Sequence, residues 1–289
     1  MPDAPLDGLD VAPSELEFLE KIGSGCTAEV FRGILRGKVV AIKQIDWKKG
    51  SMEPSKQRSF DREVAVMKRV NHPNLVAFLG VTSDKSHFCI VTEFCAGDCC
   101  FELLHNSDNV ELCWRQQLKM CSDVAKAMVY LHNFDPQIIH RDLKSLNLLL
   151  VKTVRTSEDK PEVKVSDFGL SRMKDKAEDE WTSMTTAAGT CHWMAPEVAA
   201  GSVYDEKVDV YSFAMILFEV ICREIPYEDE EPSNVGRLTL EGVRPDLEAV
   251  PPDCPEMLRD LMIVCWHADP KQRPPFDKIY DILKLIRVR

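Results

Sequence analysis

Predicted strands and predicted helices occupy separate parts of this chain, and that separation limits the folds it can adopt. Short runs rich in β-branched and aromatic residues, at 39–45 and 88–93, predict strands. Between them, apolar residues such as Phe60 and Met67 recur at helical spacing and predict one helix over 56–70. The first part of the chain therefore reads as strands with a single helix.

The pattern becomes helical after Gly97. Longer helices are predicted at 114–132, 207–222, 255–266 and 276–286, and two short strands at 148–151 and 163–165. We expect a flexible lead-in over 1–14, a strand-rich lobe over 15–94 and a helix-rich lobe over 95–289. Because glycine adopts many backbone conformations, Gly97 would permit a hinge between the two lobes.

Charge limits the class of partner. The 289 residues carry a formal net charge of −11, with 45% hydrophobic and 29% charged residues. Binding to a nucleic-acid backbone needs a positive field, so no nucleic-acid partner is expected. The longest apolar run, 211–222, is too short to span a bilayer and contains Glu219, and the acidic first ten residues do not resemble a signal peptide. No membrane insertion is expected.

The eleven cysteines do not read as a disulfide framework, because their number is odd and many lie in apolar runs. Reduced, buried thiols in a cytoplasmic protein are the favoured interpretation. The cluster of Cys95, Cys99 and Cys100 lacks a second Cys/His pair at zinc spacing, so no metal site is predicted there.

A glycine-rich turn follows the first predicted strand. Ile22, Gly23, Ser24 and Gly25 open the segment, and Ala28 stands where a third glycine is usual. Glycines let backbone amides approach phosphate oxygens closely, so the segment could cover a phosphate group. An ordinary tight hairpin has a similar sequence, and both interpretations stay open here.

Lys43 follows Val40-Ala41-Ile42 in the next predicted strand. Ala41 and Lys43 share one face of that strand, while Val40 and Ile42 share the other. The lysine is either a solvated edge residue or a partner of phosphates and of a carboxylate. Glu63, on the predicted helix, is the natural carboxylate, although it could equally be an exposed surface residue.

The most specific segment is His140-Arg141-Asp142-Leu143-Lys144-Ser145-Leu146-Asn147. Asp167-Phe168-Gly169 and then Ala195-Pro196-Glu197 follow it. With the glycine-rich turn and the Lys43 strand, the chain resembles the eukaryotic protein kinases over nearly its whole length. The resemblance implies an α+β fold of two lobes: a small antiparallel-sheet lobe with one main helix, and a larger, mostly helical lobe. It also implies that the protein uses ATP and Mg²⁺.

The resemblance also implies roles at matching positions. Lys43 would hold the α- and β-phosphates of ATP through an ion pair with Glu63, and Asp167 and Asn147 would bind magnesium. Asp142 would orient the substrate hydroxyl and accept its proton. Lys144 would neutralise charge on the transferred phosphoryl group.

An adenine pocket is implied as well. The residues expected around the adenine are Ile22, Val30, Ala41, Leu149, Glu93 and Cys95. Glu93 and Cys95 would contribute backbone hydrogen bonds, and the apolar residues could equally be plain core packing. Thr92 would guard the back of the pocket, where its small side chain leaves room for larger ligands.

The residue types within the motifs indicate which substrate hydroxyl is phosphorylated. Lys144 follows Asp142 by two residues, as in serine/threonine kinases, whereas Trp193-Met194-Ala195-Pro196-Glu197 is similar to tyrosine kinases. The combination resembles the tyrosine-kinase-like group of serine/threonine kinases, with mixed-lineage and Raf-like kinases most alike. Dual specificity, a nucleotide-binding pseudokinase scaffold and a small-molecule kinase on a related fold are the alternatives.

Regulation is predicted between Asp167 and Glu197. Phosphate on Thr186 or Thr185, placed by an upstream kinase or by trans-autophosphorylation, would pair with Arg141 and order this segment. Thr182 and Ser183 are further candidates, and an unmodified solvated loop is the alternative.

Two supporting contacts are expected in the large lobe and a third between the two lobes. Glu197 and Arg273 would form a buried ion pair. Asp209, at the start of an apolar helix, would receive hydrogen bonds from the backbone at 140–141. The residues expected to stack above Asp209 are Met67, Phe78, Phe168 and His140.

Overall fold

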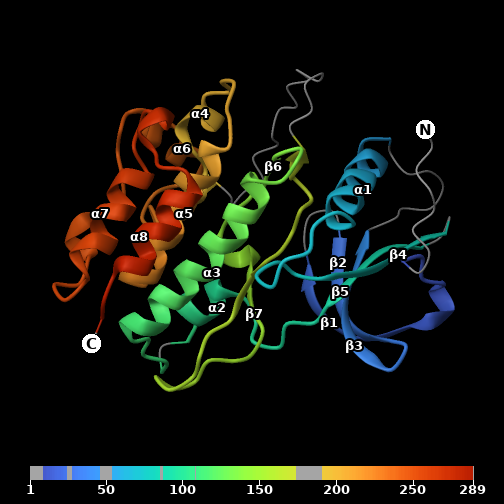
Figure 1. Cartoon of the computed structure of the whole chain (residues 1–289). Helices are drawn as coiled ribbons and strands as arrows, with labels where there is room; N and C mark the ends of the chain where they lie inside the picture. Colours follow the sequence, from blue (N-terminus) through green and yellow to red (C-terminus); the bar gives the residue numbers. More distant parts are fainter. Residues whose placement is uncertain are drawn as a thin grey trace.

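The computed structural model describes residues 9–24, 28–45, 54–84, 87–107, 109–173 and 191–288. Its first part is an antiparallel sheet of five strands in the order β1-β2-β3-β5-β4. The strands are β1 (Leu16–Ser24), β2 (Ala28–Leu35), β3 (Lys38–Ile45), β4 (Phe78–Asp84) and β5 (His87–Glu93). One helix, α1 (Pro54–Met67), lies beside this sheet (Figure 1).

Alternation along β3 separates a buried face of the sheet from a half-buried one. Val40 and Ile42 are fully buried in a cluster with residues of β2 and β5, whereas Ala41 and Lys43 are half-buried on the opposite face. The predicted division of this strand into two faces is therefore confirmed.

The chain before β1 is part of the sheet's edge. The backbone N–H of Val11 donates to Val81 at 2.9 Å, Val81 N–H donates to Leu9 at 2.8 Å, and Val11 is buried. Residues 9–11 of the predicted lead-in are therefore paired with β4, while the bounds of the lead-in stay a prediction. Residues 1–8 lie outside the described part.

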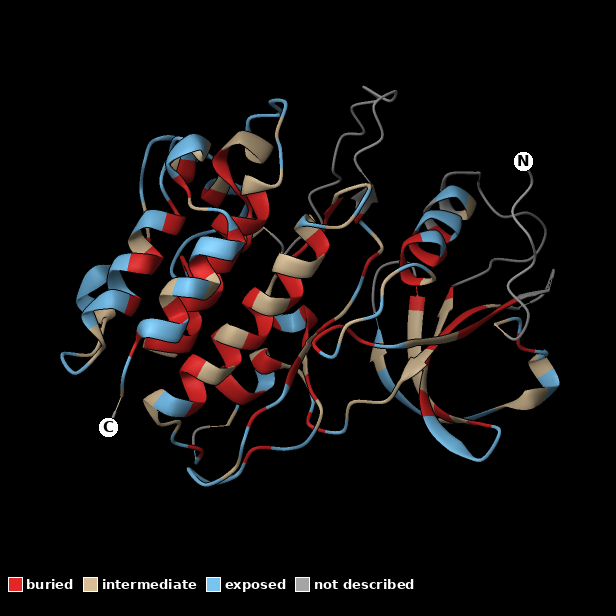
Figure 2. Cartoon of the chain, in the orientation of Figure 1, coloured by how far each residue is buried: buried red, intermediate tan, exposed pale blue. Residues whose placement is uncertain are grey.

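The second part of the chain is mostly helical. Its helices are α2 (Cys100–His105), α3 (Trp114–His132), α4 (Pro196–Ala199), α5 (Lys207–Cys222), α6 (Pro232–Leu240), α7 (Glu256–Cys265) and α8 (Phe276–Leu285). Nearly every residue of α5 is buried, and Figure 2 shows the buried residues gathered where the helices face one another. Among the described residues, no helix is both long and apolar enough to cross a membrane.

Four short strands lie between α3 and α4. They form two pairs, β6 (Ile138–Ile139) with β9 (Arg172–Met173) and β7 (Leu148–Leu150) with β8 (Val163–Val165). The strand-rich part and the helical part together confirm the predicted α+β kinase fold of two lobes.

The long helices begin and end close to the predicted residues, and α3 and α5 do so at the same residues. Sequence reasoning missed α2, α4 and α6, which are short and carry too few apolar residues to produce a clear period. Helix α1 ends at Met67, three residues before its predicted end, because residues 68–70 continue as a turn.

Gly97 has a packing role in addition to the predicted hinge, which stays a prediction. A Cβ atom there would lie 2.4 Å from the backbone of Lys152 and 2.7 Å from Leu150. The N–H of Gly97 donates to Leu150 at 2.9 Å, and that of Leu150 donates to Asp98. Glycine is therefore required for close approach of two chain segments.

Candidate active site

Three charged residues from separate elements meet where the sheet faces the helical part. Lys43 Nζ on β3 lies 2.7 Å from Glu63 Oε1 on α1 and 3.0 Å from Asp167 Oδ1 after β8. The Glu63 side chain is 6% exposed and that of Asp167 is 44% exposed. The lysine thus joins a buried carboxylate to one that faces the opening.

Lys43, Glu63 and Asp167 shift one another's pKa values. Burial by itself would raise the pKa of Asp167, but the Lys43 charge, together with hydrogen bonds from Lys43 and the Gly169 N–H, lowers it to about 2. Burial raises the pKa of Glu63 and would lower that of Lys43, yet the two neighbouring carboxylates keep the pKa of Lys43 above its ordinary value. Lys43 is therefore a permanent cation.

Asp142 lies in the loop between β6 and β7 with two polar neighbours from the same segment. Lys144 Nζ is 2.8 Å from Asp142 Oδ2, and Asn147 Nδ2 donates to Asp142 Oδ2 at 3.0 Å and to its carbonyl at 2.8 Å. Because both bonds from Asn147 use the amide nitrogen, its orientation leaves the side-chain oxygen pointing away from Asp142. Asp142 is 8% exposed.

Asp209 at the start of α5 holds the beginning of this loop. Its Oδ2 accepts the N–H of His140 and its Oδ1 accepts the N–H of Arg141, each at 2.8 Å. Arg141 has a positive φ of 72°, a conformation that costs energy unless its surroundings hold it. The predicted contact of Asp209 with residues 140–141 is confirmed.

His140 supports the loop and does not face solvent. It is fully buried, its Nδ1 accepts the Asp142 N–H at 3.4 Å, and its Nε2 therefore donates to the carbonyl of Ser166 at 3.0 Å. Its ring lies 5.6 Å from the ring of Phe168. The contact of His140 with Phe168 agrees with the predicted stack, whose order through Met67 and Phe78 stays a prediction.

Asn147 and Asp167 are brought together by β7 and β8. The N–H and hydroxyl of Ser166 donate to the carbonyl of Asn147 at 2.9 and 3.0 Å, so the residue before Asp167 is bonded directly to Asn147. A Cβ at Gly169 would lie 3.1 Å from Asp167 Oδ1 and 3.3 Å from Glu63 Oε2, which favours glycine there. The two predicted metal ligands are thus neighbours.

Comparison with known families supports the same interpretation. The family model for protein tyrosine and serine/threonine kinases matches residues 16–283. The chain belongs to this protein kinase family. The predicted resemblance to the protein kinases is confirmed. The roles of Lys43, Asp142 and Asp167 stay predictions.

Several curated kinases are similar over almost the whole chain. Serine/threonine-protein kinase CTR1 of Arabidopsis thaliana is 39% identical over 279 residues, covering 96% of this chain and 32% of the relative. The probable serine/threonine-protein kinase SIS8 of Arabidopsis thaliana is 38% identical, covering 94% of this chain and 25% of the relative. The probable serine/threonine-protein kinase drkC of Dictyostelium discoideum is 38% identical, covering 92% and 34%. This kinase domain therefore spans about a quarter to a third of these relatives.

The predicted adenine-pocket residues come from the five-stranded sheet, from the segment that follows β5 and from β7. Val30 on β2 pairs with Lys43, Ala41 on β3 pairs with Thr92 on β5, and Leu149 on β7 forms a bridge with Cys99. Gly23 pairs with Val30, close to Ile22 and Ser24 at the end of β1. Gly25 lies outside the described residues, and the roles of these residues stay predictions.

The segment after Thr92 is tied to the helical part by a side chain. Glu93 Oε1 accepts the Ala77 N–H and the Lys164 ammonium group, both at 2.7 Å. Cys95 follows two residues later, and burial raises the pKa of its thiol to about 11. The Glu93 carboxylate therefore has a structural role in addition to the predicted role of its backbone.

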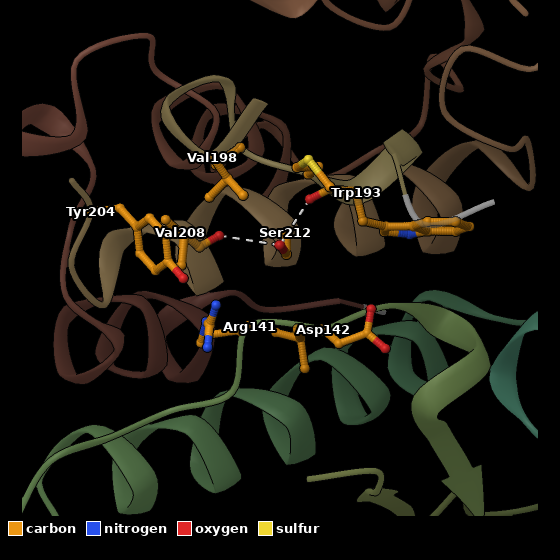
Figure 3. Close-up of a pocket in the computed structure, with 10 residues that line it drawn as sticks. Arg141, Asp142, Trp193, Val198, Tyr204, Val208 and Ser212 are labelled. Atoms are coloured by element: carbon orange, nitrogen blue, oxygen red, sulfur yellow. Dashed lines mark hydrogen bonds between the residues drawn. The ribbon is translucent and has the colours of Figure 1, made fainter. Parts of the chain in front are cut away.

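A small pocket lies beside Asp142 and Arg141. It is lined by those two residues, Leu143, Trp193, Met194, Ala195, Val198, Tyr204, Val208 and Ser212 (Figure 3). The Arg141 guanidinium faces the ring of Tyr204 at 5.4 Å and donates to the carbonyl of Leu170 at 3.2 Å. The predicted phosphorylation sites Thr182, Ser183, Thr185 and Thr186 lie outside the described residues.

The predicted ion pair of the large lobe is confirmed. Arg273 Nη1 and Nη2 lie 2.5 and 2.9 Å from the two oxygens of Glu197, and the Arg273 side chain is fully buried. This two-point contact holds the start of α4, next to the pocket.

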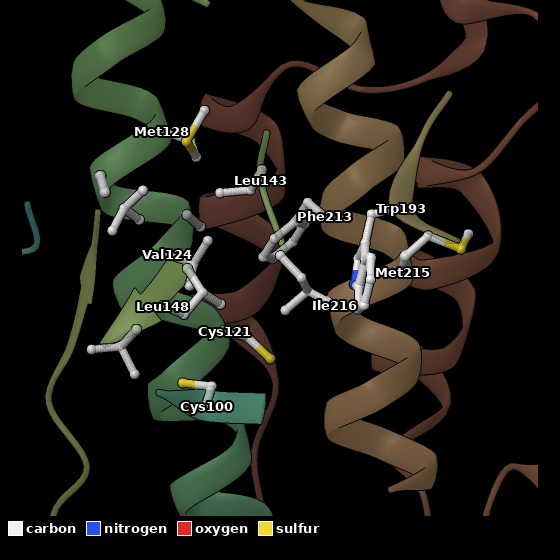
Figure 4. Close-up of a cluster of buried hydrophobic side chains, with 14 of the residues drawn as sticks. Cys100, Cys121, Val124, Met128, Leu143, Leu148, Trp193, Phe213, Met215 and Ile216 are labelled. Atoms are coloured by element: carbon white, nitrogen blue, oxygen red, sulfur yellow. The ribbon is translucent and has the colours of Figure 1, made fainter. Parts of the chain in front are cut away.

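Sequence reasoning missed one polar contact within the large core. Glu219 on α5 is fully buried and accepts hydrogen bonds from Ser145 and Trp193. Figure 4 shows the Trp193 ring among apolar side chains beside α5. The only local signal was a glutamate within an apolar run, which indicates a buried partner without identifying it.

Proposed function

We propose that this kinase domain transfers the γ-phosphoryl group of ATP to serine and threonine hydroxyls of protein substrates. The observation that supports this best is the contact of Lys43 with both Glu63 and Asp167, which lie 20 and 124 residues away in sequence. A permanent cation held in this way suits the phosphates of ATP. The names of the relatives, all serine/threonine kinases, favour those hydroxyls.

We propose that Lys43 binds the α- and β-phosphates and that Glu63 keeps its ammonium group in position. The adenine would lie among Ile22, Val30, Ala41 and Leu149, with Thr92 at the back and the backbone of Glu93 and Cys95 as hydrogen-bonding partners. The glycine-rich segment containing Gly23, Ser24 and Gly25 would cover the phosphates. This assignment takes 15–94 as the small lobe and 95–289 as the large lobe.

Asp167 and Asn147 fit a magnesium ion. The Asp167 carboxylate is partly exposed and ionised at neutral pH, and Asn147 keeps its side-chain oxygen away from Asp142. Mg²⁺ prefers oxygen ligands of this type. When bound, the ion would neutralise negative charge on the phosphates, while Lys43 supplies a second positive charge from the protein.

Asp142 would position the substrate hydroxyl. Its carboxylate is held by Asn147 and by Lys144, so its direction is set before a substrate arrives. Orientation is its main contribution, and it accepts the hydroxyl proton as the bond to phosphorus forms. Lys144, 2.8 Å from Asp142, would balance charge on the transferred group.

The first prediction is that Asp142→Asn lowers phosphoryl transfer from labelled ATP and magnesium to a generic protein by at least about 100-fold. Nucleotide binding stays, because Lys43 and Asp167 are unchanged. Asp281→Asn on the exposed face of α8 is the matched control. Label on serine or threonine that persists undiminished in Asp142→Asn would refute the proposal. Label on tyrosine as well would identify the dual-specificity alternative. A wild type that binds nucleotide without transferring phosphate would be a scaffold.

We further propose that phosphate on Thr186 or Thr185 pairs with Arg141 and activates the enzyme. The phosphate would come from an upstream kinase or from a second copy of this enzyme, in a cytoplasmic signalling context. Arginine forms two-point contacts with phosphate oxygens, and Arg141 precedes Asp142 directly.

The second prediction concerns this segment. A Thr185→Ala/Thr186→Ala double variant loses at least about tenfold of the activity of the phosphorylated wild type. Thr153→Ala, which changes an exposed threonine between β7 and β8, leaves activity unchanged. If the double variant and a phosphate-free wild type both kept the full activity of the phosphorylated wild type, the segment would need no phosphate.

A further inference from the structure

Glu219 is a carboxylate placed where carboxylates are costly. It is fully buried inside α5, and burial raises its pKa. Its Oε1 accepts the hydroxyl of Ser145 at 2.5 Å and lies 3.0 Å from Nε2 of His105, and its Oε2 accepts the indole N–H of Trp193 at 2.6 Å. Three donors from three elements thus converge on two oxygens, the arrangement that an acceptor-only carboxylate satisfies.

Two of those donors belong to segments next to Asp142 and to the pocket beside it. Ser145 lies between Lys144 and Asn147, in the short helical turn Ser145–Asn147, and is fully buried. Trp193 ends the turn Cys191–Trp193, immediately before the segment that lines the pocket beside Asp142. One carboxylate is therefore bonded both to the loop that holds Asp142 and to the wall of the neighbouring pocket.

Helix α5 presents its polar groups to these segments along one side. Asp209, Ser212 and Glu219 are separated by three and seven residues, which returns them to the same side of a helix. Asp209 holds residues 140–141, Ser212 donates to the Trp193 carbonyl at 2.8 Å, and Glu219 holds Ser145 and the Trp193 indole. The loop containing Asp142 is thereby fixed on both sides by one rigid element.

We propose that Glu219 is a positioning residue, whose buried carboxylate couples the Asp142 loop, through Ser145, to Trp193 at the substrate-side wall of the pocket. This inference rests on the proposed function, because positioning has meaning only if Asp142 orients a hydroxyl. Small displacements of a reacting group cost large factors in rate. Loss of either hydrogen bond should therefore reduce kcat more than it changes nucleotide binding.

The test removes one donor at a time and leaves the carboxylate. Ser145→Ala and Trp193→Phe should each lower kcat at least about tenfold, with KM for ATP changed less than about twofold, because Lys43 and Glu63 are untouched. The double variant should lose less than the product of the two single losses, because both act through one carboxylate.

Matched controls delete the same groups elsewhere. Trp114→Phe removes an indole N–H that donates to Asp253 at 2.9 Å, and Ser107→Ala removes a hydroxyl that donates to the Glu102 carbonyl at 3.0 Å. Both lie outside the proposed coupling, so kcat and KM should stay within about twofold of wild type.

A second measurement needs no activity. The indole N–H resonance of Trp193, identified by its loss in Trp193→Phe, should move in Ser145→Ala and stay in place in Ser107→Ala. An unmoved Trp193 resonance overturns the coupling, even if the wild type transfers no phosphate and the proposed function fails. A moved resonance with an unchanged kcat in Ser145→Ala overturns the positioning role and leaves the proposed function standing.

Discussion

Single residues of the site owe their charge state to neighbours that are distant in sequence. Asp167 comes after β8, Lys43 lies on β3 and Glu63 on α1, yet all three share one cluster of hydrogen bonds. Isolated, each would be an ordinary surface charge. Together they give Lys43 a pKa above its usual range and Asp167 a pKa of about 2.

The lowered pKa of Asp167 determines the pH range over which its carboxylate stays ionised. A depressed carboxylate pKa contributes stability that is present above the ordinary value, about 3.9, and is lost as the pH falls through about 2. Asp167 therefore stays ionised at every pH between 5 and 8, and any loss of activity in that range comes from another group.

The third prediction is that the Asp167 carboxyl ¹³C resonance titrates near pH 2 in the wild type. In Lys43→Met, its midpoint rises, because the charge and the hydrogen bond of Lys43 no longer oppose burial. Lys284→Met, which removes a lysine paired with Asp281 on α8, is the control and leaves the midpoint in place. A wild-type midpoint above pH 5 would contradict the assigned contact between Lys43 and Asp167.

At the scale of elements, α5 organises the large lobe. It is buried along nearly its whole length, so its polar residues have no water to satisfy them and must bond to the segments packed around it. Gly97 illustrates a second contact between elements, since its missing side chain lets the chain after β5 lie against residues 150–152.

The fourth prediction concerns that close approach. Gly97→Ala should lower the free energy of unfolding by about 1–3 kcal/mol, because the added Cβ would force the backbone of Lys152 to move. It should also weaken ATP binding, since Cys95 lies two residues away. Gly236→Ala on α6 is the control, as its Cβ would lie 3.3 Å from that of Ala199 and alanine favours the helix. Urea denaturation measures the free energy of unfolding of both variants. Equal values for Gly97→Ala and Gly236→Ala would contradict the required close approach.

Across the whole molecule, the two lobes are joined by more than the chain after β5. Leu75, between α1 and β4, forms a bridge with Val165 of β8, and Asn74 Nδ2 donates to the Val163 carbonyl at 2.9 Å. The ion pair of Lys164 with Glu93 lies nearby. Helix α1, which carries Glu63, is therefore connected at its end to the strand that precedes Asp167.

The fifth prediction tests this junction. Asn74→Ala should lower the free energy of unfolding by about 1–3 kcal/mol, because it leaves a buried carbonyl of Val163 without its donor. Asn133→Ala, which removes an exposed bond to Asp277, should cost within about 0.5 kcal/mol. The comparison uses denaturant unfolding, and equal losses would mean that the junction adds nothing to stability.

Sequence alone predicted the elements and residues whose signals are local. Apolar periodicity was enough for α3, and a continuous apolar run was enough for α5. The motifs around Asp142 and Asp167 indicated the family because their residue types and order are specific. The partner of Asp209 could also be predicted, since a carboxylate at the start of an apolar helix needs donors and the kinase likeness names them.

Only the tertiary structure decided which distant groups share a partner. Glu219 gave no indication that Ser145 and Trp193 would meet at its two oxygens, and Gly97 gave none that Lys152 would pack against it. Residues 9–11 carried no strand signal, yet they pair with β4. The physical reason is common to all three: local preference sets the direction of a segment, whereas burial against another segment sets which of its polar groups must be satisfied and by what.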